Sequence, residues 1–193
     1  MQLLKNLNFD TLKDNIKDFT IDPNSSYIKS YPEFIEFFKS KDKITEHDLI
    51  ISSHFVYGWM PTIINLKLDN TNHVLELLNQ AKKGRLLKKA ELETLKKAIN
   101  NSMVGASKLL HFINPKIYAI WDSRIYRYLT EKKSAYGIGK VDLYLEYLGG
   151  LEKIAYTTGF GEIQNKISNT VGYQISANRA IELVMFEAGK KVG

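Results

Sequence analysis

Apolar residues recur along this chain at intervals of three and four positions, and no stretch shows the sustained alternation of apolar and polar residues that marks a strand. The helical spacing is clearest at 3–7, 34–38, 49–56 and 74–78. Because a helix with one apolar face must bury that face, the pattern predicts an all-α, compact multi-helix domain. A chain of 193 residues fits one helical domain, 1–193, or two small helical lobes with a cleft between them.

Short signals for helix ends divide the chain in the same way. Pro32 is typical of the first turn of a helix, where the missing amide hydrogen costs nothing. Thr45 with Asp48 resembles a cap, and Asn70 or Thr71 is predicted to cap the next helix. Further helices are predicted at 86–100, 123–130, 141–148, 161–168 and 176–190, with a surface loop at 132–140 and a break at Gly149 and Gly150.

The composition excludes several classes of protein. With 44% hydrophobic residues, 25% charged residues and only 4 prolines, the chain is globular and neither disordered nor collagenous. It contains no cysteine, and its four histidines, at 47, 54, 73 and 111, are too scattered for a metal-ligand spacing, so we expect neither metal nor cofactor. A secretory signal and a long apolar run are both absent from the sequence, so we expect no membrane partner and a cytoplasmic location.

A formal net charge of +6 favours an anionic partner such as nucleic acid, because basic side chains displace counterions from phosphates. The densest basic run is Lys82, Lys83, Arg85, Lys88, Lys89, Lys96 and Lys97. This run is either the solvated face of a helix or a surface that meets phosphates. The loop at 132–140 is a second, weaker candidate for a phosphate cradle, since it mixes glycine, serine and lysine.

The segment 101–130 is predicted to form a turn, a helix, a bend and a second helix, and it holds the main candidates for chemistry. Gly105 permits another group to approach the start of the first helix, where free amides favour an anion. Asn114 and Pro115 end that helix. Asp122 follows an apolar stretch and is expected to cap the next helix, where the amides keep its carboxylate ionised. Such a carboxylate can stabilise a positively charged sugar in a transition state.

In this segment the chain resembles the helix-hairpin-helix DNA glycosylases, a family of helical enzymes. In that family a glycine-containing hairpin grips the DNA backbone, and an aspartate at the start of a downstream helix serves catalysis. Val104 and Gly105 carry the match to the hairpin, and the run Asp-Ser-Arg-Ile at 122–125 carries the match to the catalytic segment. The resemblance covers about thirty residues and implies a helix-hairpin-helix element at 101–130.

The resemblance implies hydrolysis of the N-glycosidic bond of a damaged or modified base that is flipped out of duplex DNA. Asp122 would stabilise the oxocarbenium ion and orient water. Bifunctional members place a lysine nucleophile near the start of the hairpin's second helix, where counting from Gly105 gives Ser107, with Lys108 one residue later. The implied enzyme is therefore monofunctional, and Lys108 is a phosphate contact, a Schiff-base nucleophile or a solvent-facing helix lysine.

The residues that the resemblance places near the DNA backbone are Val104, Gly105, Ser107, Arg124 and Arg127. The two arginines could equally pair with acidic neighbours. An alternative reading is a non-catalytic helical protein that binds DNA or another partner through the hairpin and has no working base pocket. A helical protein unrelated to DNA is a third possibility.

Four further side chains are candidates for contact with the substrate base. Tyr57 and Trp59 flank a glycine and could sandwich a base, or they pack in the core at the end of a helix. His111 lies three residues after Lys108 and could line the same pocket, or it is a hydrogen-bonded core histidine. Trp121 directly precedes Asp122 and is the fourth candidate.

Overall fold

The computed structural model describes residues 3–58, 64–67 and 69–191, which form ten α-helices and a single turn of 3₁₀ helix, η1. Within these residues the only β pairing is an isolated bridge between Leu66 and Ile99. The elements are α1 (Phe9–Asn15), η1 (Ile16–Asp18), α2 (Ser26–Lys39), α3 (Glu46–Gly58), α4 (Thr71–Lys82), α5 (Lys89–Ala98), α6 (Met103–Ile113), α7 (Ser123–Thr130), α8 (Val141–Ala155), α9 (Phe160–Val171) and α10 (Ala177–Gly189). The prediction of an all-α, compact fold is confirmed.

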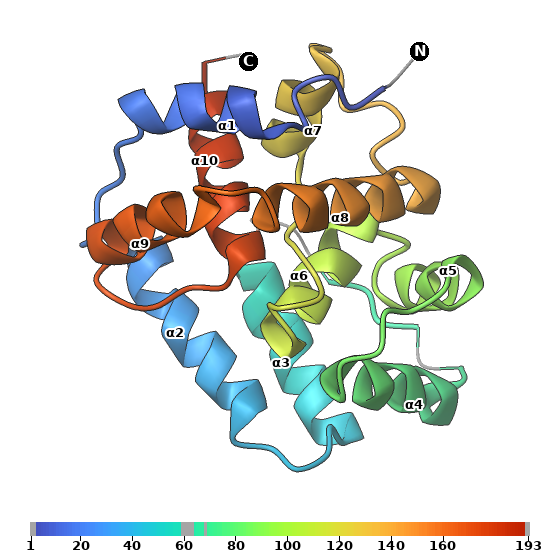
Figure 1. Cartoon of the computed structure of the whole chain (residues 1–193). Helices are drawn as coiled ribbons and strands as arrows, with labels where there is room; N and C mark the ends of the chain where they lie inside the picture. Colours follow the sequence, from blue (N-terminus) through green and yellow to red (C-terminus); the bar gives the residue numbers. More distant parts are fainter. Residues whose placement is uncertain (1–2, 59–63, 68, 192–193) are drawn as a thin grey trace.

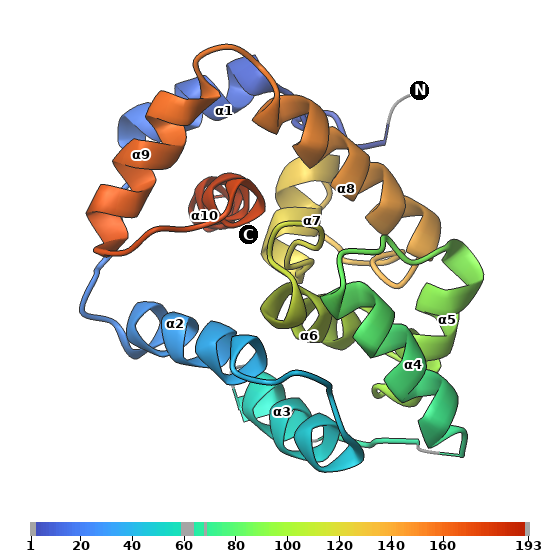
Figure 2. The same cartoon turned by 60° about the horizontal axis from the view of Figure 1, so that its bottom comes forward.

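The helices pack as two groups that meet along the middle of the molecule. Helices α2 to α6 contact one another, while α1 and α7 to α9 gather around α10. Figure 2 views α10 along its axis, with α1, α7, α8 and α9 around it and α2 on the remaining side. The segment between α6 and α7 joins the groups, and α5 also contacts α8 (Figure 1). Residues near either end of this segment therefore lie where the two groups meet.

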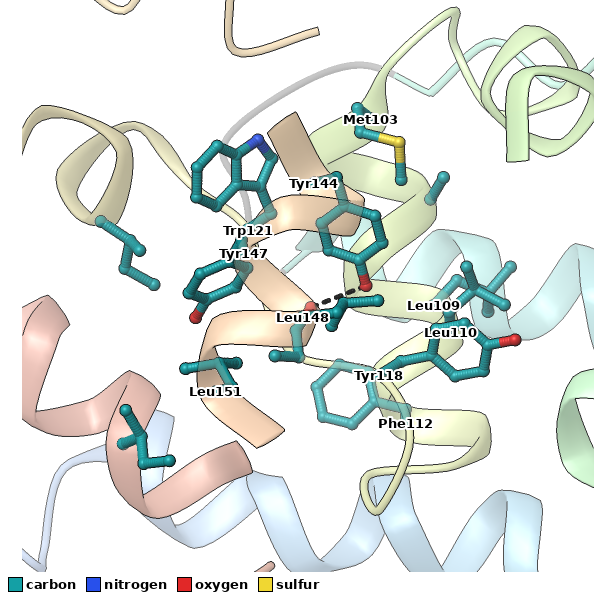
Figure 3. Close-up of a cluster of buried hydrophobic side chains, with 14 of the residues drawn as sticks. Met103, Leu109, Leu110, Phe112, Tyr118, Trp121, Tyr144, Tyr147, Leu148 and Leu151 are labelled. Atoms are coloured by element: carbon teal, nitrogen blue, oxygen red, sulfur yellow. Dashed lines mark hydrogen bonds between the residues drawn. The ribbon is translucent and has the colours of Figure 1, made fainter. Parts of the chain in front are cut away.

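Aromatic side chains fill the centre of the core beside α6 and α8. Trp121 packs on Tyr147 with ring centroids 4.8 Å apart, and Figure 3 draws both rings next to the α8 ribbon. Tyr144 donates a hydrogen bond of 3.0 Å to the carbonyl of Ala119, and Tyr147 donates one of 3.3 Å to the carbonyl of Ile120. These bonds satisfy the polar ends of buried tyrosines and fix the extended segment that leads to Asp122.

Local capping signals predicted several helix ends correctly. Helix α7 spans the predicted residues 123–130, and Asp122 caps it. The side chains of Thr45 and Asp48 bond reciprocally to each other's backbone amides at the start of α3. Helix α4 begins at Thr71 as expected, although its cap residue, Asn70, makes no side-chain capping bond. The predicted loop at 132–140 contains no helix.

The prediction that Pro32 lies in a first turn is wrong. Helix α2 begins at Ser26, with Ser25 as its cap, so Pro32 lies inside the helix. An internal proline leaves the carbonyl of the residue four positions earlier without its helical donor. The hydroxyl of Tyr173 donates a 2.9 Å hydrogen bond to that carbonyl, on Ile28, and so supplies the missing donor.

The predicted break at Gly149 and Gly150 is also wrong, because α8 continues through both to Ala155. Gly150 serves packing: a Cβ atom there would overlap the side chain of Leu7 and approach its Cδ1 to 3.2 Å. The helix predicted at 86–100 is shorter than expected. The backbone at Lys88 is extended, and its amide donates to the Glu91 carboxylate. Lys88 is therefore the cap residue, and α5 begins at Lys89.

No helix in the described part of the chain combines the length and the apolar character needed to cross a membrane.

Candidate functional site

The turn between α5 and α6 is the predicted hairpin region. Asn100 and Asn101 both adopt positive φ angles, 58° and 49°, a conformation that asparagine tolerates better than most residues. The turn is held from one side by the segment 65–67, since the amide of Asn100 donates to the carbonyl of Asn65 over 3.1 Å. Ser102 then caps α6 by accepting a 3.1 Å hydrogen bond from the amide of Gly105.

Gly105 is buried, and the direction in which a side chain would project from it is occupied by Tyr57. A Cβ atom at residue 105 would overlap the Tyr57 hydroxyl and lie 3.0 Å from its Cζ. Tyr57 is only 3% exposed and belongs to the core, so the packing interpretation of this tyrosine is supported. The glycine gives room to a core ring, whereas Val104 beside it is half-buried and faces the surface in part. Trp59, its proposed partner in a base sandwich, lies outside the described residues.

Ser107 and Trp121 are fully buried, which corrects their proposed contacts with DNA and with the base. The Ser107 hydroxyl donates to the carbonyl of Val104 over 2.9 Å and accepts from the amide of Trp121 over 3.0 Å. The indole of Trp121 donates to the carbonyl of Ile138 over 2.9 Å. Both residues therefore tie α6 to the segment that enters α7, and they position Asp122.

Asp122 caps α7 through one carboxylate oxygen. Its Oδ1 accepts hydrogen bonds from the amides of Arg124 and Ile125, at 2.9 and 3.0 Å. The side chain is partly exposed, and its Oδ2 accepts no hydrogen bond from the described residues. The cap fixes the carboxylate by one oxygen and leaves the second oxygen for another group.

Lys108 is 7% exposed and points into the protein, so its interpretation as a solvent-facing lysine is wrong. Burial lowers the pKa of its ammonium, because the charged form loses hydration. The negative charges of Asp122 and Glu182 act in the opposite direction, while the positive charge of Arg179 lowers the pKa further. Lys108 and Asp122, which the sequence put forward separately, are thus electrostatic neighbours.

His111 is a core histidine with both ring nitrogens engaged. Its Nδ1 lies 2.8 Å from the carbonyl of Tyr118 and must be the donor, because a carbonyl only accepts. Its Nε2 therefore accepts from the hydroxyl of Tyr31, also at 2.8 Å. Burial, assisted by the charge of Arg179, lowers its pKa to about 3, so the ring is neutral at physiological pH. This placement supports the core interpretation over direct contact with a base.

A buried ion pair on α10 was not predicted from the sequence. Arg179 donates to the carboxylate of Glu182, and neither side chain is exposed. The guanidinium also lies over the ring of Tyr31, 4.3 Å from its centroid, and over that of Tyr27, at 5.4 Å. The sequence signal for the burial of this pair was the apolar run around it. A helix that is apolar on nearly all sides is buried, and its charged residues are then buried as well.

A surface pocket of about 690 Å³ lies between the chain entering α2, the start of α7 and the end of α10. Tyr27 and Phe186 stack in its wall with ring centroids 5.9 Å apart, and Arg124 lies 4.7 Å from the Phe186 centroid. Lys190, Asp22 and Glu187 complete the charged rim. Tyr27 therefore links the pocket to the buried Arg179, since its ring lines the pocket and lies under the guanidinium.

The remaining basic candidates differ in exposure. Arg124 is exposed at the pocket, whereas Arg127 is half-buried. Four residues of the basic run bind to other groups of the protein. Three form ion pairs: Arg85 with Glu91 at 2.6 Å, Lys89 with Asp142 at 2.6 Å, and Lys96 with Glu93 at 3.1 Å. The fourth, Lys82, donates a hydrogen bond to the carbonyl of Phe38. Within the described residues no cluster of three or more histidine, aspartate or glutamate side chains is arranged to hold a metal ion.

No protein-family model, curated protein sequence or solved structure matches this chain.

Proposed function

We propose that this protein is a monofunctional DNA glycosylase-like enzyme, a hydrolase acting in the cytoplasm on a damaged or modified base of duplex DNA. The observation that carries the proposal is the position of Asp122. Its carboxylate is fixed by two amides through Oδ1, keeps Oδ2 available, and lies in the field of the Lys108 ammonium. A fixed carboxylate of this kind can oppose the positive charge that develops when a glycosidic bond breaks.

In the proposed reaction the target nucleotide leaves the duplex, and its base enters the pocket beside Tyr27 and Phe186. The bond between the base and C1′ of the sugar breaks, and Asp122 stabilises the oxocarbenium ion. The departing nucleobase takes the electron pair of the broken bond. Asp122 also orients a water molecule, whose oxygen bonds to C1′ while its proton passes to the departing nucleobase. The pocket volume of about 690 Å³ has room for a nucleobase. The planar base would stack between the rings of Tyr27 and Phe186 once these rings separate slightly.

Contact with the DNA backbone is assigned to the turn before α6 and to the start of α7. Val104 and the exposed Asn101 lie at the turn, and Arg124 is exposed beside the pocket. Arg127 is the weaker candidate because it is half-buried. The net charge of +6 supports this assignment, since it favours a phosphate partner over the whole surface.

The test is to incubate the protein with duplexes that carry different lesions or natural modifications and to measure abasic sites and released bases. We expect Asp122→Asn to reduce base release by about 10²–10³-fold, the usual effect of removing one electrostatic contact with a transition state. Asparagine caps a helix about as well as aspartate, so the melting temperature should change little.

Asp142→Asn is the matched control, because Asp142 is exposed and pairs only at the surface with Lys89. It should leave base release unchanged. Full activity of Asp122→Asn on any substrate would eliminate the assigned mechanism.

The closed packing around Lys108 favours a second candidate function, a helical protein that binds DNA without removing a base. Lys108 and His111 are buried among core residues, so a base could reach them only after the site opens. Affinity for duplex DNA that falls with salt, with no released base detected by mass spectrometry, would favour this candidate.

A further inference from the structure

The loop between α7 and α8, residues 132–140, carries the most exposed aromatic side chain of the described residues. Tyr136 is 86% exposed. Figure 1 shows the connection between the two helices at the upper right of the molecule. A ring left in water contributes no burial free energy to the core, so the stability of the fold does not explain its presence. The ring is available to a partner.

The backbone of this loop is fixed, although the Tyr136 ring lies in solvent. The carbonyl of Tyr136 accepts a 2.6 Å hydrogen bond from the hydroxyl of Tyr126, and its amide donates to the hydroxyl of Ser134 over 3.1 Å. The carbonyl of Ile138 accepts a 2.9 Å hydrogen bond from the indole of Trp121. Trp121 and Tyr126 belong to the buried core. A partner that binds the loop would therefore lose little affinity to ordering its backbone.

The turn at Gly137 brings a positive charge close to the exposed ring. Gly137 has a φ of 97°, and its carbonyl accepts a 3.1 Å hydrogen bond from the amide of Lys140. The Lys140 side chain folds back along this turn, because its Cε would lie 3.9 Å from a Cβ atom at residue 137. The ammonium is bonded to Cε, so it lies near the residue that directly follows Tyr136.

The loop carries three exposed lysines that form no ion pair within the described residues. They are Lys132, Lys133 and Lys140. The two acidic residues that flank the loop are each neutralised by a lysine from elsewhere in the chain. Glu131 pairs with Lys5 and Asp142 pairs with Lys89, both at 2.6 Å. The three loop lysines are therefore left as an excess of positive charge around the exposed ring.

We infer that this loop is a binding site for single-stranded nucleic acid, with a base stacked on Tyr136 and the neighbouring phosphates at the three lysines. Lysines alone would suit any polyanion, and the exposed ring adds a requirement for a planar group between the phosphates. Bases in a duplex cover one another's faces, so only an unpaired base offers its face to the ring. The site goes beyond the proposed function, since it uses neither Asp122 nor the pocket beside Tyr27.

The first experiment separates stacking from charge. Fluorescence anisotropy measures the binding of an oligothymidylate of about 12 nucleotides and of an oligomer of the same length whose sugars carry no bases. The wild type should bind the oligothymidylate about 5–150-fold more tightly, the usual effect of one base stacked on an aromatic ring. Tyr136→Ala should bind the two oligomers equally. Unchanged affinity of Tyr136→Ala for the oligothymidylate would overturn the inference, as would a wild type that does not bind it at low salt.

Tyr156→Ala is the matched control. Tyr156, at the end of α8, is 83% exposed, and the exposed Glu152 and Lys153 near it carry opposite charges. It should bind both oligomers as the wild type does. A duplex of the same length tests the requirement for an unpaired base: if Tyr136→Ala weakens duplex binding as much as single-strand binding, the ring does not select single strands.

The second experiment tests the lysines through the dependence of affinity on salt. Removing three phosphate contacts with Lys132→Gln/Lys133→Gln/Lys140→Gln should lower the slope of log affinity against log salt by about 2 for a single strand. The control Lys13→Gln/Lys29→Gln/Lys153→Gln removes the same charge from exposed positions on α1, α2 and α8. An equal loss of slope in both proteins would mean that total charge, and not the loop, attracts the strand. None of these oligomers carries a damaged base, so an absence of glycosylase activity would refute the proposed function and leave this result standing.

Discussion

Replacing Gly105 with alanine separates two explanations for this glycine, packing against a core ring and close approach of the DNA backbone. Alanine is preferred over glycine inside a helix by up to about 1 kcal/mol. The new Cβ would overlap the Tyr57 hydroxyl and lie 3.0 Å from Cζ, and such overpacking in a core costs about 1–3 kcal/mol. We therefore expect Gly105→Ala to lower the free energy of unfolding by about 0–2 kcal/mol.

The partner change is Tyr57→Phe, which removes the atom that the alanine overlaps. In that background the overlap with the hydroxyl is gone, although the Cβ still lies 3.0 Å from Cζ and 3.1 Å from Cε2 of the ring, so alanine at 105 should destabilise less than it does beside Tyr57. The coupling between the two positions should then be about 0.5–3 kcal/mol, the range found for residues in contact, and a double-mutant cycle resolves it. Urea unfolding of the four proteins, followed by circular dichroism, measures it.

DNA affinity of the same four proteins tests the second explanation. If Gly105 serves packing alone, the double variant should bind duplex DNA as Tyr57→Phe does. If the DNA backbone approaches Gly105, the affinity should stay low although stability has been partly restored. A Gly105→Ala protein more stable than the wild type, with Tyr57 intact, would refute the packing argument.

Two predictions concern buried hydrogen bonds. Tyr173→Phe removes the donor to the Ile28 carbonyl opposite Pro32, and we expect it to lower the free energy of unfolding by about 1–3 kcal/mol, measured in urea, because a buried carbonyl loses its partner. His111 has a folded pKa of about 3 and an ordinary value of 6.5, so the unfolded chain binds the extra proton between these values. The contribution of His111 to the free energy of unfolding should therefore be intact above pH 6.5 and fall by about 1.4 kcal/mol per pH unit as the pH drops toward 3. This dependence of the free energy of unfolding on pH should be absent from His111→Gln. Equal slopes for the two proteins would contradict the prediction.

The helices that sequence predicted best are those whose ends depend on neighbouring residues. Asp122 caps α7 through amides two and three positions later, so the signal for 123–130 is complete within the segment. Two of the errors arose where the deciding contact is distant in sequence. Pro32 is accommodated by Tyr173, and Gly150 by Leu7, and neither partner can be read from the local pattern.

The candidate site was predicted only where its residues share one local segment, and not where it depends on contacts between distant helices. Asp122 and Lys108 stood out through their place in one segment, but the burial of Lys108 depends on how the helices pack around α6. Arg179 and Glu182 were overlooked because charged residues on a helix usually face solvent. The apolar run on both sides of the pair was the sequence signal that could have placed them in the core.

The crossing of α7 and α10 has a consequence for how the protein folds. Gly189 lets the two helices approach so closely that a Cβ there would lie 2.8 Å from the carbonyl oxygen of Arg124. This approach packs α10, which carries Arg179 and Glu182, against α7, which Asp122 caps, although two helices separate α7 from α10 in the chain. Closing such a long loop is slow compared with forming a helix, so the charged site should assemble late in folding.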